Sequence, residues 1–368
     1  MGNQRRKVAD AEEHVPLPKT AAIIYSDVQR SYFPTEEQYI TERDADRDAH
    51  LIGDSVTSLG IDVRFHPGDA DLPARLYESR PEVVINLVDS VKGLEHMASA
   101  IPGVLELLDL PYTGADVFGL ALGSNKFLVK KLLQQHGVPV PYFQLFAKPS
   151  DPIDPTIRFP LISKLNSIHG GVEITADAVS ETEKHLRKRL RYLIRTYKQP
   201  VLVEEFISGR EVTAIALQDG KKRVYMAEKV FARRGGRYVF LTFEDQWLSG
   251  SDEAFRYKKY TDPLLKEYVK TAFTVTGMAG YGKFDIRRDQ SGRYFFIDAN
   301  PNPALGPKEL AVATAVIADM YGVPFDAIMR QIIRNALRAP RHRAAGVEPS
   351  AAGVLGTLPE VAAYPDGE

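Results

Sequence analysis

The segment from residue 282 to residue 303 constrains this chain more than any other part of its sequence. It reads as a β-hairpin in which Asp285 ends one apolar run and Asp298 ends the next, with Asn300 two residues further on and on the same face as Asp298. Oxygen ligands gathered at the end of a sheet suit Mg²⁺, so the hairpin predicts a metal and nucleotide site. The alternative is a pair of solvent-facing aspartates followed by an ordinary Asn-Pro loop.

Length, charge and the lack of cysteine narrow the classes of protein to consider. The 368 residues are enough for two or three domains, and 47 Lys and Arg against 48 Asp and Glu leave a net charge of −1. A net charge this small gives no overall electrostatic attraction to nucleic acid or to a membrane, so the partners of the chain are expected to be small molecules. The absence of cysteine excludes disulfides, thiolate metal sites and cysteine nucleophiles. No apolar run has signal-peptide or transmembrane length, and a cytoplasmic enzyme is expected.

The first third of the chain has a βαβ pattern. Apolar strands are predicted at 21–25, 61–65 and 83–87, with a helix at 47–59. This alternation predicts a small parallel sheet whose functional loops follow the strands, near Ser26 and residues 88–90.

The remainder alternates strands with helices. The segment Ser124–Lys126 opens a helix that stops at Gly137, before Pro139. Further strands are predicted at 142–146, 161–164, 201–204, 210–217 and 224–230, and further helices at 180–197, 262–276 and 308–321. After Arg338 the composition turns to Arg and then to Ala, Gly and Pro, which predicts a disordered tail.

Several positions in this second region fit phosphate binding. Lys164 ends an apolar strand, where a buried ammonium needs an anionic partner. Gly170 and Gly171 allow a loop that lays backbone N–H groups against phosphate oxygens, and Lys126 opens a helix where an anion is also favoured. Each feature alone is more often a solvated lysine or a simple turn, but their order along the chain favours a nucleotide site.

The ordered set resembles the ATP-grasp ligases, and among them the D-alanine–D-alanine ligases, over about residues 19 to 338. The segments that carry the resemblance are Leu110–Gly114, Ser124–Lys126, Gly137–Pro141, Glu204–Glu211 and the Asp285, Asp298, Asn300 set. The resemblance implies an α/β fold, α+β in the ATP-grasp part, with a Rossmann-like N-terminal domain followed by the two-lobed ATP-grasp fold. The implied parts are a flexible tail (1–18), a substrate domain (19–121), a central lobe with a lid loop (122–206), a C-terminal lobe with the metal site (207–338) and a disordered tail (339–368).

The resemblance also implies a role for each site residue. The implied ATP-binding residues are Lys126 and Lys164 for the phosphates, His169, Gly170 and Gly171 for the lid, Glu204, Glu205 and Ile207 for the adenine, and Glu211 for the ribose. Asp285, Asp298 and Asn300 would hold two Mg²⁺ ions, with Mn²⁺ as an alternative.

Three further residues are catalytic candidates. Lys283 stands where similar ligases carry an arginine that stabilises the transferring group, and it keeps the charge without the bidentate fork. Arg287 would reach a substrate carboxylate or pair with Asp289. Lys308 would pair with a substrate carboxylate or simply start a helix.

The implied function is that of an enzyme, an ATP-dependent carboxylate–amine ligase. A substrate carboxylate attacks the γ-phosphate to give an acyl phosphate, and an amine then displaces phosphate to leave an amide. The expected partners are a small acid and a small amine, with no nucleic acid and no membrane, and similar ligases are commonly homodimers.

Departures from the resemblance leave the substrate open. Gly170 stands where the D-alanine enzymes carry a serine, and Lys283 replaces their arginine. For the amino-terminal glutamate of those enzymes, Glu42 is only a candidate. A related ligase for another amino acid or a peptide-like acid is therefore the main prediction. The alternatives are a D-alanine–D-alanine ligase proper, and a weakened ATP-binding protein or a phosphotransferase on the same fold.

Overall fold

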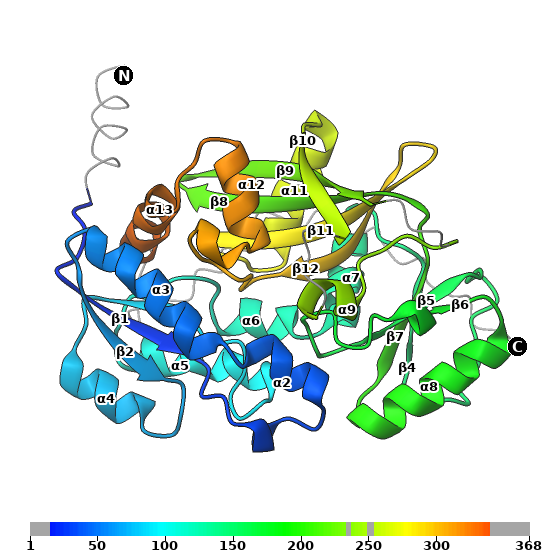
Figure 1. The fold of residues 1–368 in the computed structure, drawn as a ribbon, viewed down its shortest axis with the longest axis horizontal. Helices are drawn as coiled ribbons and strands as arrows, with labels where there is room; N and C mark the ends of the chain where they lie inside the picture. Colours follow the sequence, from blue (N-terminus) through cyan, green and yellow to red (C-terminus); the bar gives the residue numbers. More distant parts are fainter. Residues whose placement is uncertain (1–14, 233–236, 249–253, 339–368) are drawn as a thin grey trace, which may run out of the picture.

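The computed structural model describes residues 15–232, 237–248 and 254–338. Their strands form three sheets, which occupy three different regions of the molecule in Figure 1. The predicted tail at 339–368 and most of the one at 1–18 lie outside the described residues. The other predicted domain boundaries stay predictions.

The first sheet is parallel, as predicted, with strand order β2-β1-β3. Its strands are β1 (Thr20–Tyr25), β2 (Asp62–Pro67) and β3 (Val83–Leu87). The central strand β1 is buried on both faces, so its side chains alternate between two cores. Ile23 packs with Ile52 of α3, whereas Ile24 packs with Leu76 of α4. The helical segments of this part are η1 (Arg30–Tyr32), α2 (Glu36–Glu42), α3 (Ala45–Ser58), α4 (Leu72–Ser79), η2 (Glu95–Ser99), α5 (Ala100–Leu107) and α6 (Val117–Gly123).

The second sheet is antiparallel, has the order β4-β7-β5-β6 and follows helix α7 (Lys126–Gln135). Its strands are β4 (Phe143–Phe146), β5 (Leu161–Leu165), β6 (Val179–Ser180) and β7 (Val201–Glu205), with the short helix η3 (Ala176–Ala178) before β6. Helix α8 (Glu183–Tyr197) packs on this sheet. The predicted start of α8 at Ser180 is wrong, because Ser180 pairs with β5 and Thr182 caps the helix by accepting from the backbone N–H of His185.

The third sheet is antiparallel with the order β10-β9-β8-β11-β12 and contains the predicted hairpin. Its strands are β8 (Gly209–Asp219), β9 (Lys221–Phe231), β10 (Phe255–Tyr260), β11 (Tyr281–Asp289) and β12 (Tyr294–Asn300). The helices of this part are α9 (Phe243–Trp247), α11 (Pro263–Val275), η4 (Lys308–Leu310), α12 (Ala313–Met320) and α13 (Phe325–Arg338). The single helix predicted at 308–321 is wrong, because Ala311 takes a left-handed conformation (φ 50°) between η4 and α12.

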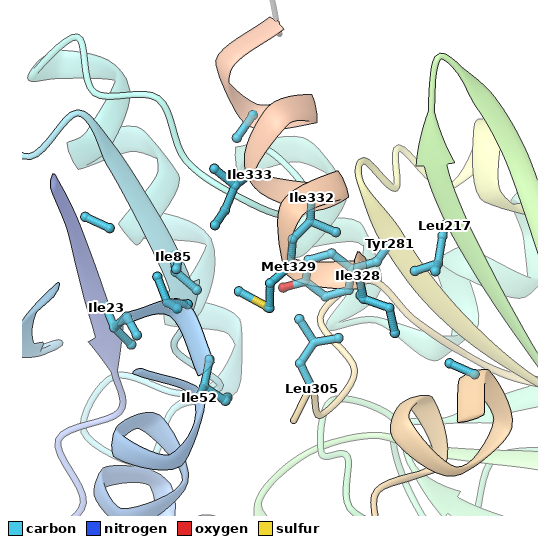
Figure 2. Packing of buried hydrophobic residues seen from close by; sticks show 14 of the residues in the cluster. Ile23, Ile52, Ile85, Leu217, Tyr281, Leu305, Ile328, Met329, Ile332 and Ile333 are labelled. Atoms are coloured by element: carbon cyan, nitrogen blue, oxygen red, sulfur yellow. The ribbon is translucent and has the colours of Figure 1, made fainter. Parts of the chain in front are cut away.

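Helix α13 joins the first and third sheets into one core. Figure 2 shows Ile332 and Ile333 of α13 between Ile23 and Ile85 of the first sheet and Leu217 and Tyr281 of the third. The first strand and the last described helix therefore share one core. Among the described residues, no helix is both long and apolar enough to cross a membrane.

Candidate functional site

A cavity of about 530 Å³ is lined by residues of the second and third sheets, of helix α2, and of the loops, including the one that follows strand β3 of the first sheet. Every predicted site residue lines this cavity except Lys308. The Lys308 ammonium lies 3.2 Å from a carboxylate oxygen of Asp319, and its side chain is 75% exposed. The structure therefore places Lys308 at the surface, in an ion pair with Asp319 of α12, and does not bring it to the cavity.

The hairpin β11–β12 presents four polar side chains to one face. Asp285 pairs directly with Asp298 across the two strands, and Lys283 pairs with Asn300. A bulge between Asp285 and Ile286 shifts the register after these pairs. The Lys283 ammonium contacts Asp285, while Oδ1 of Asp298 is buried and has no hydrogen-bond partner among the described residues. A buried carboxylate oxygen without a partner is suited to a cation that binds with the substrate.

Both hairpin carboxyl groups are held in the charged form. Burial alone would raise the pKa of Asp285, but the ammonium groups of Lys229 and Lys283 hold that pKa well below its usual range. Burial likewise opposes ionisation of Asp298, yet Lys126 and other nearby cations leave its pKa lowered. Two carboxylates and the Asn300 amide are a donor set that Mg²⁺ accepts, with phosphate and water oxygens completing the shell. No cluster of three His, Asp or Glu side chains suited to a metal occurs within the described ranges.

A second charged network crosses strands β8, β9 and β11. Glu211 accepts from Lys229 at 2.7 Å, and its other oxygen lies 2.9 Å from the Arg287 guanidinium. Burial disfavours the ammonium of Lys229, but Asp285 and Glu211 raise its pKa. The expected pairing of Arg287 with Asp289 is wrong, because Arg293 occupies Asp289 at 2.8 Å. Lys229 was missed in the sequence, where it follows Glu228 near the end of the strand predicted at 224–230.

Lys126 and Lys164 line the predicted phosphate side of the cavity, and Lys130 lies next to Lys126 but outside the cavity lining. The Lys164 ammonium lies 3.1 Å from one oxygen of Glu204, and Lys130 lies 3.1 Å from the other. Lys126, four residues before Lys130 on α7, donates to the Ile168 carbonyl at 2.6 Å. Burial lowers the pKa of Lys130 to about 8. Sequence reasoning missed Lys130, which the i, i+4 spacing places on the same helix face as Lys126.

The carboxyl groups predicted to frame the adenine both have protein partners. Glu204 is occupied by its two lysines, and Glu205 accepts from the backbone N–H of Arg158 at 2.8 Å. Apolar residues that line the same end of the cavity are Ile162, Phe206, Ile207, Phe240 and Leu241. A flat ring would therefore meet an apolar wall and backbone here, with the two glutamates holding that wall in place.

The glycine-bearing loop after β5 closes one side of the cavity. Gly170 and Gly171 both have positive φ angles, of 69° and 70°. A Cβ on Gly170 would lie 2.6 Å from Thr41 of α2, so the loop needs glycine there to approach the first domain. The Trp247 indole N–H donates to the Gly170 carbonyl at 2.7 Å. The loop is thus held from two sides.

A third part of the cavity lining, called the acidic wall below, carries the carboxyl groups of Glu42, Asp89 and Glu95. Ser90 donates to Glu42 at 2.7 Å, and burial raises the pKa of Glu42 to about 7. Burial also raises the pKa of Asp89, whose carboxylate accepts a 3.4 Å hydrogen bond from Asn302. Glu95 accepts from the backbone N–H of His169 at 2.8 Å and contacts its ring. The sequence indicated Glu42 only as a candidate, and Asp89 and Glu95 were not singled out as site residues.

The similarity of this chain to known proteins is independent of the geometry of the cavity. A family model described as the D-ala D-ala ligase C-terminus matches residues 132–334, more than half of the chain. A D-alanine–D-alanine ligase of Alcanivorax borkumensis is 30% identical over 244 residues, which are 66% of this chain and 74% of that protein. An uncharacterized protein of Sinorhizobium fredii, y4sG, is 27% identical over 241 residues, 64% of this chain and 70% of its own.

The fold has a counterpart among solved structures. A D-alanine–D-alanine ligase of Bacillus anthracis complexed with ATP superposes with a TM-score of 0.66 at 16% identity. The match covers 87% of this chain and 98% of that one.

Proposed function

Because the chain belongs to the D-alanine–D-alanine ligase family and has its ATP-grasp fold, it is an ATP-dependent carboxylate–amine ligase, and we propose how its residues perform that reaction. The observation that carries the proposal is the direct pairing of Asp285 with Asp298 in a cavity that also holds Lys126 and Lys164. Anionic ligands for a divalent ion and cations for phosphates face one space.

Asp285, Asp298 and Asn300 would hold two Mg²⁺ ions, which neutralise phosphate charge and align the transferring group. The partnerless Oδ1 of Asp298 supports this assignment. Lys126 and Lys164 bind the phosphates, and the lid with Gly170 and Gly171 excludes water from the reactive acyl phosphate. Lys283, held beside Asp285, stabilises charge on the transferring group.

Glu211 and Arg287 have more limited roles in this proposal. Lys229 and Arg287 occupy both oxygens of Glu211, so a ribose hydroxyl would join an ion pair that already exists. Arg287 is buried and donates to the Val239 carbonyl at 2.9 Å, so it positions Glu211 instead of reaching a substrate carboxylate.

The substrates follow from the acidic wall. The oxygens of Glu42, Asp89 and Glu95 can accept hydrogen bonds from an ammonium group, which an amino acid or a peptide-like acid supplies. The homodimer and the cytoplasmic location stay predictions.

The test measures Mg²⁺-dependent ADP and phosphate release with D- and L-amino acids, singly and in pairs, and the mass of the product. We expect equal ADP and phosphate with a new amide mass. Asp298→Asn should lower the rate about 100-fold or more, because it removes a charge that the phosphates require. Lys308→Ala is the matched control and should change the rate less than about twofold, because Lys308 lies outside the cavity. ADP without an amide for any pair would contradict the ligase assignment.

A further inference from the structure

The lid histidine His169 is held in a defined orientation by Glu95 of η2. The backbone N–H of His169 donates to both oxygens of Glu95, at 2.8 and 2.9 Å, and Nδ1 of the ring contacts one of them. A proton on Nδ1 then faces the carboxylate, which leaves Nε2 as the basic nitrogen. This is the arrangement that prepares a histidine to accept a proton.

The second ring nitrogen has no partner of its own. Nε2 of His169 is buried and makes no hydrogen bond within the described part of the chain, although the residue lines the cavity. His169 is near enough to Asp298 for the two side chains to interact electrostatically. A buried ring nitrogen without a partner, beside the reacting end of the cavity, calls for a donor from the substrate.

Amide formation supplies such a donor. The amine substrate is an ammonium ion at neutral pH and has no lone pair with which to attack, so one proton must leave before the bond forms. The carboxyl groups of the acidic wall already have protein partners, because Glu42 accepts from Ser90 and Asp89 accepts from Asn302. His169 is the neighbouring base whose acceptor nitrogen is uncommitted.

Resting on the proposed function, we propose that Nε2 of His169, oriented by Glu95, takes the proton from the attacking ammonium group. The freed lone pair attacks the acyl carbon, the new C–N bond forms, and the bond from that carbon to the phosphate oxygen breaks. The second nitrogen proton leaves with the phosphate, and the imidazolium returns its proton to solvent when the lid opens. The titratable groups that line the cavity together with His169 include Glu95 from η2, Glu42 from α2, Lys126 from α7 and Asp298 from β12.

Hydroxylamine separates this step from acyl phosphate formation. Hydroxylamine is largely unprotonated at neutral pH, so it captures the acyl phosphate as a hydroxamate without needing a base. In His169→Gln we expect amide formation at pH 7 to fall about 100-fold, while hydroxamate formation stays within about threefold of wild type. Raising the pH should increase the rate of amide formation by the variant about tenfold per pH unit, up to the pKa of the amine, because each unit supplies more free amine.

Two further variants make the test specific. Glu95→Gln should lower amide formation about tenfold and leave hydroxamate formation in place, because it weakens the orientation of the ring. His96 is an exposed neighbour of Glu95 outside the cavity lining, so His96→Gln should change neither amide formation nor hydroxamate formation. Circular dichroism and Mg-ATP binding of each variant confirm that the protein is folded.

The outcomes are distinct. Equal loss of amide and hydroxamate in His169→Gln would overturn the proposal and make His169 a part of the lid alone. Unchanged amide formation would overturn it as well. If the wild-type protein forms neither product with any acid, the proposed function itself fails, and the inference fails with it.

Discussion

Glu42 shows how the tertiary structure changes the chemistry of one residue. Its carboxyl group is buried against Ser90, and burial raises its pKa from 4.5 to about 7. Between these pH values the folded state keeps a proton that the unfolded state has lost, so this group lowers the free energy of unfolding as pH rises. We expect Glu42→Gln to be more stable than wild type by about 3 kcal/mol at pH 8 and by little at pH 4, measured by urea unfolding.

The control for this prediction is Glu78→Gln, which changes an exposed carboxylate on α4. Glu78→Gln should change the free energy of unfolding by less than about 0.5 kcal/mol at both pH values. A Glu42→Gln difference that does not change between pH 4 and pH 8 would show that the carboxyl group titrates normally in the folded protein.

At the scale of elements, α9 holds the lid loop through the backbone N–H of Phe243, which donates to Ile174, and through the side chain of Trp247. Trp247 of α9 donates to the Gly170 carbonyl while its ring lies beside Phe243. Trp247→Phe keeps an aromatic ring and removes the donor, which costs about 1 kcal/mol and shifts the lid toward the open state about fivefold. We expect more phosphate released per amide formed, because water then reaches the acyl phosphate. The measurement is the ratio of phosphate to amide product.

Tyr112→Phe is the matched control, because it also removes one aromatic donor, to Glu106, away from the cavity. Its product ratio should equal that of wild type. A wild-type ratio in Trp247→Phe would mean that the approach of Gly170 to Thr41 is enough to keep the lid closed.

At the scale of the whole molecule, α13 makes one unit of the first and third sheets. Ile332 is 1% exposed in the core that both sheets share. Ile332→Ala should lower the free energy of unfolding by about 2–5 kcal/mol, because it removes buried methyl groups and leaves a cavity. Trp247, the one tryptophan of the chain, packs with the core of the second sheet, so its fluorescence reports on a different region. We expect the fluorescence and circular dichroism midpoints in urea to fall together.

Leu107→Ala serves as the control, because Leu107 is 87% exposed and its loss should cost less than about 0.5 kcal/mol. If the circular dichroism midpoint fell while the fluorescence midpoint stayed, the second sheet would unfold as an independent unit.

Much of the candidate site could be predicted because its chemistry is local in the sequence. The spacing of Asp298 and Asn300 places both on one face of a strand, and an aspartate in the preceding strand completes the set. The helix boundaries with clear caps were also predictable, as at Asp262, which caps α11 by accepting from the backbone N–H of Leu265 at 2.9 Å. The sequence could not show that Lys308 lies outside the cavity, because a lysine at a helix start looks the same whether it faces a cavity or solvent.

The sequence by itself determined the hairpin, the parallel first sheet, the glycine loop and the family, because each depends on the period of side chains or on an ordered motif. Only the tertiary structure decided which charges meet. Lys229 and Arg287 bind Glu211 from two neighbouring strands, and Glu95 meets His169 across 74 residues of chain. Ion pairs and burial depend on distances through space, which no spacing along the chain contains. For the same reason, His169 could be proposed as the base for amide formation only from the tertiary structure.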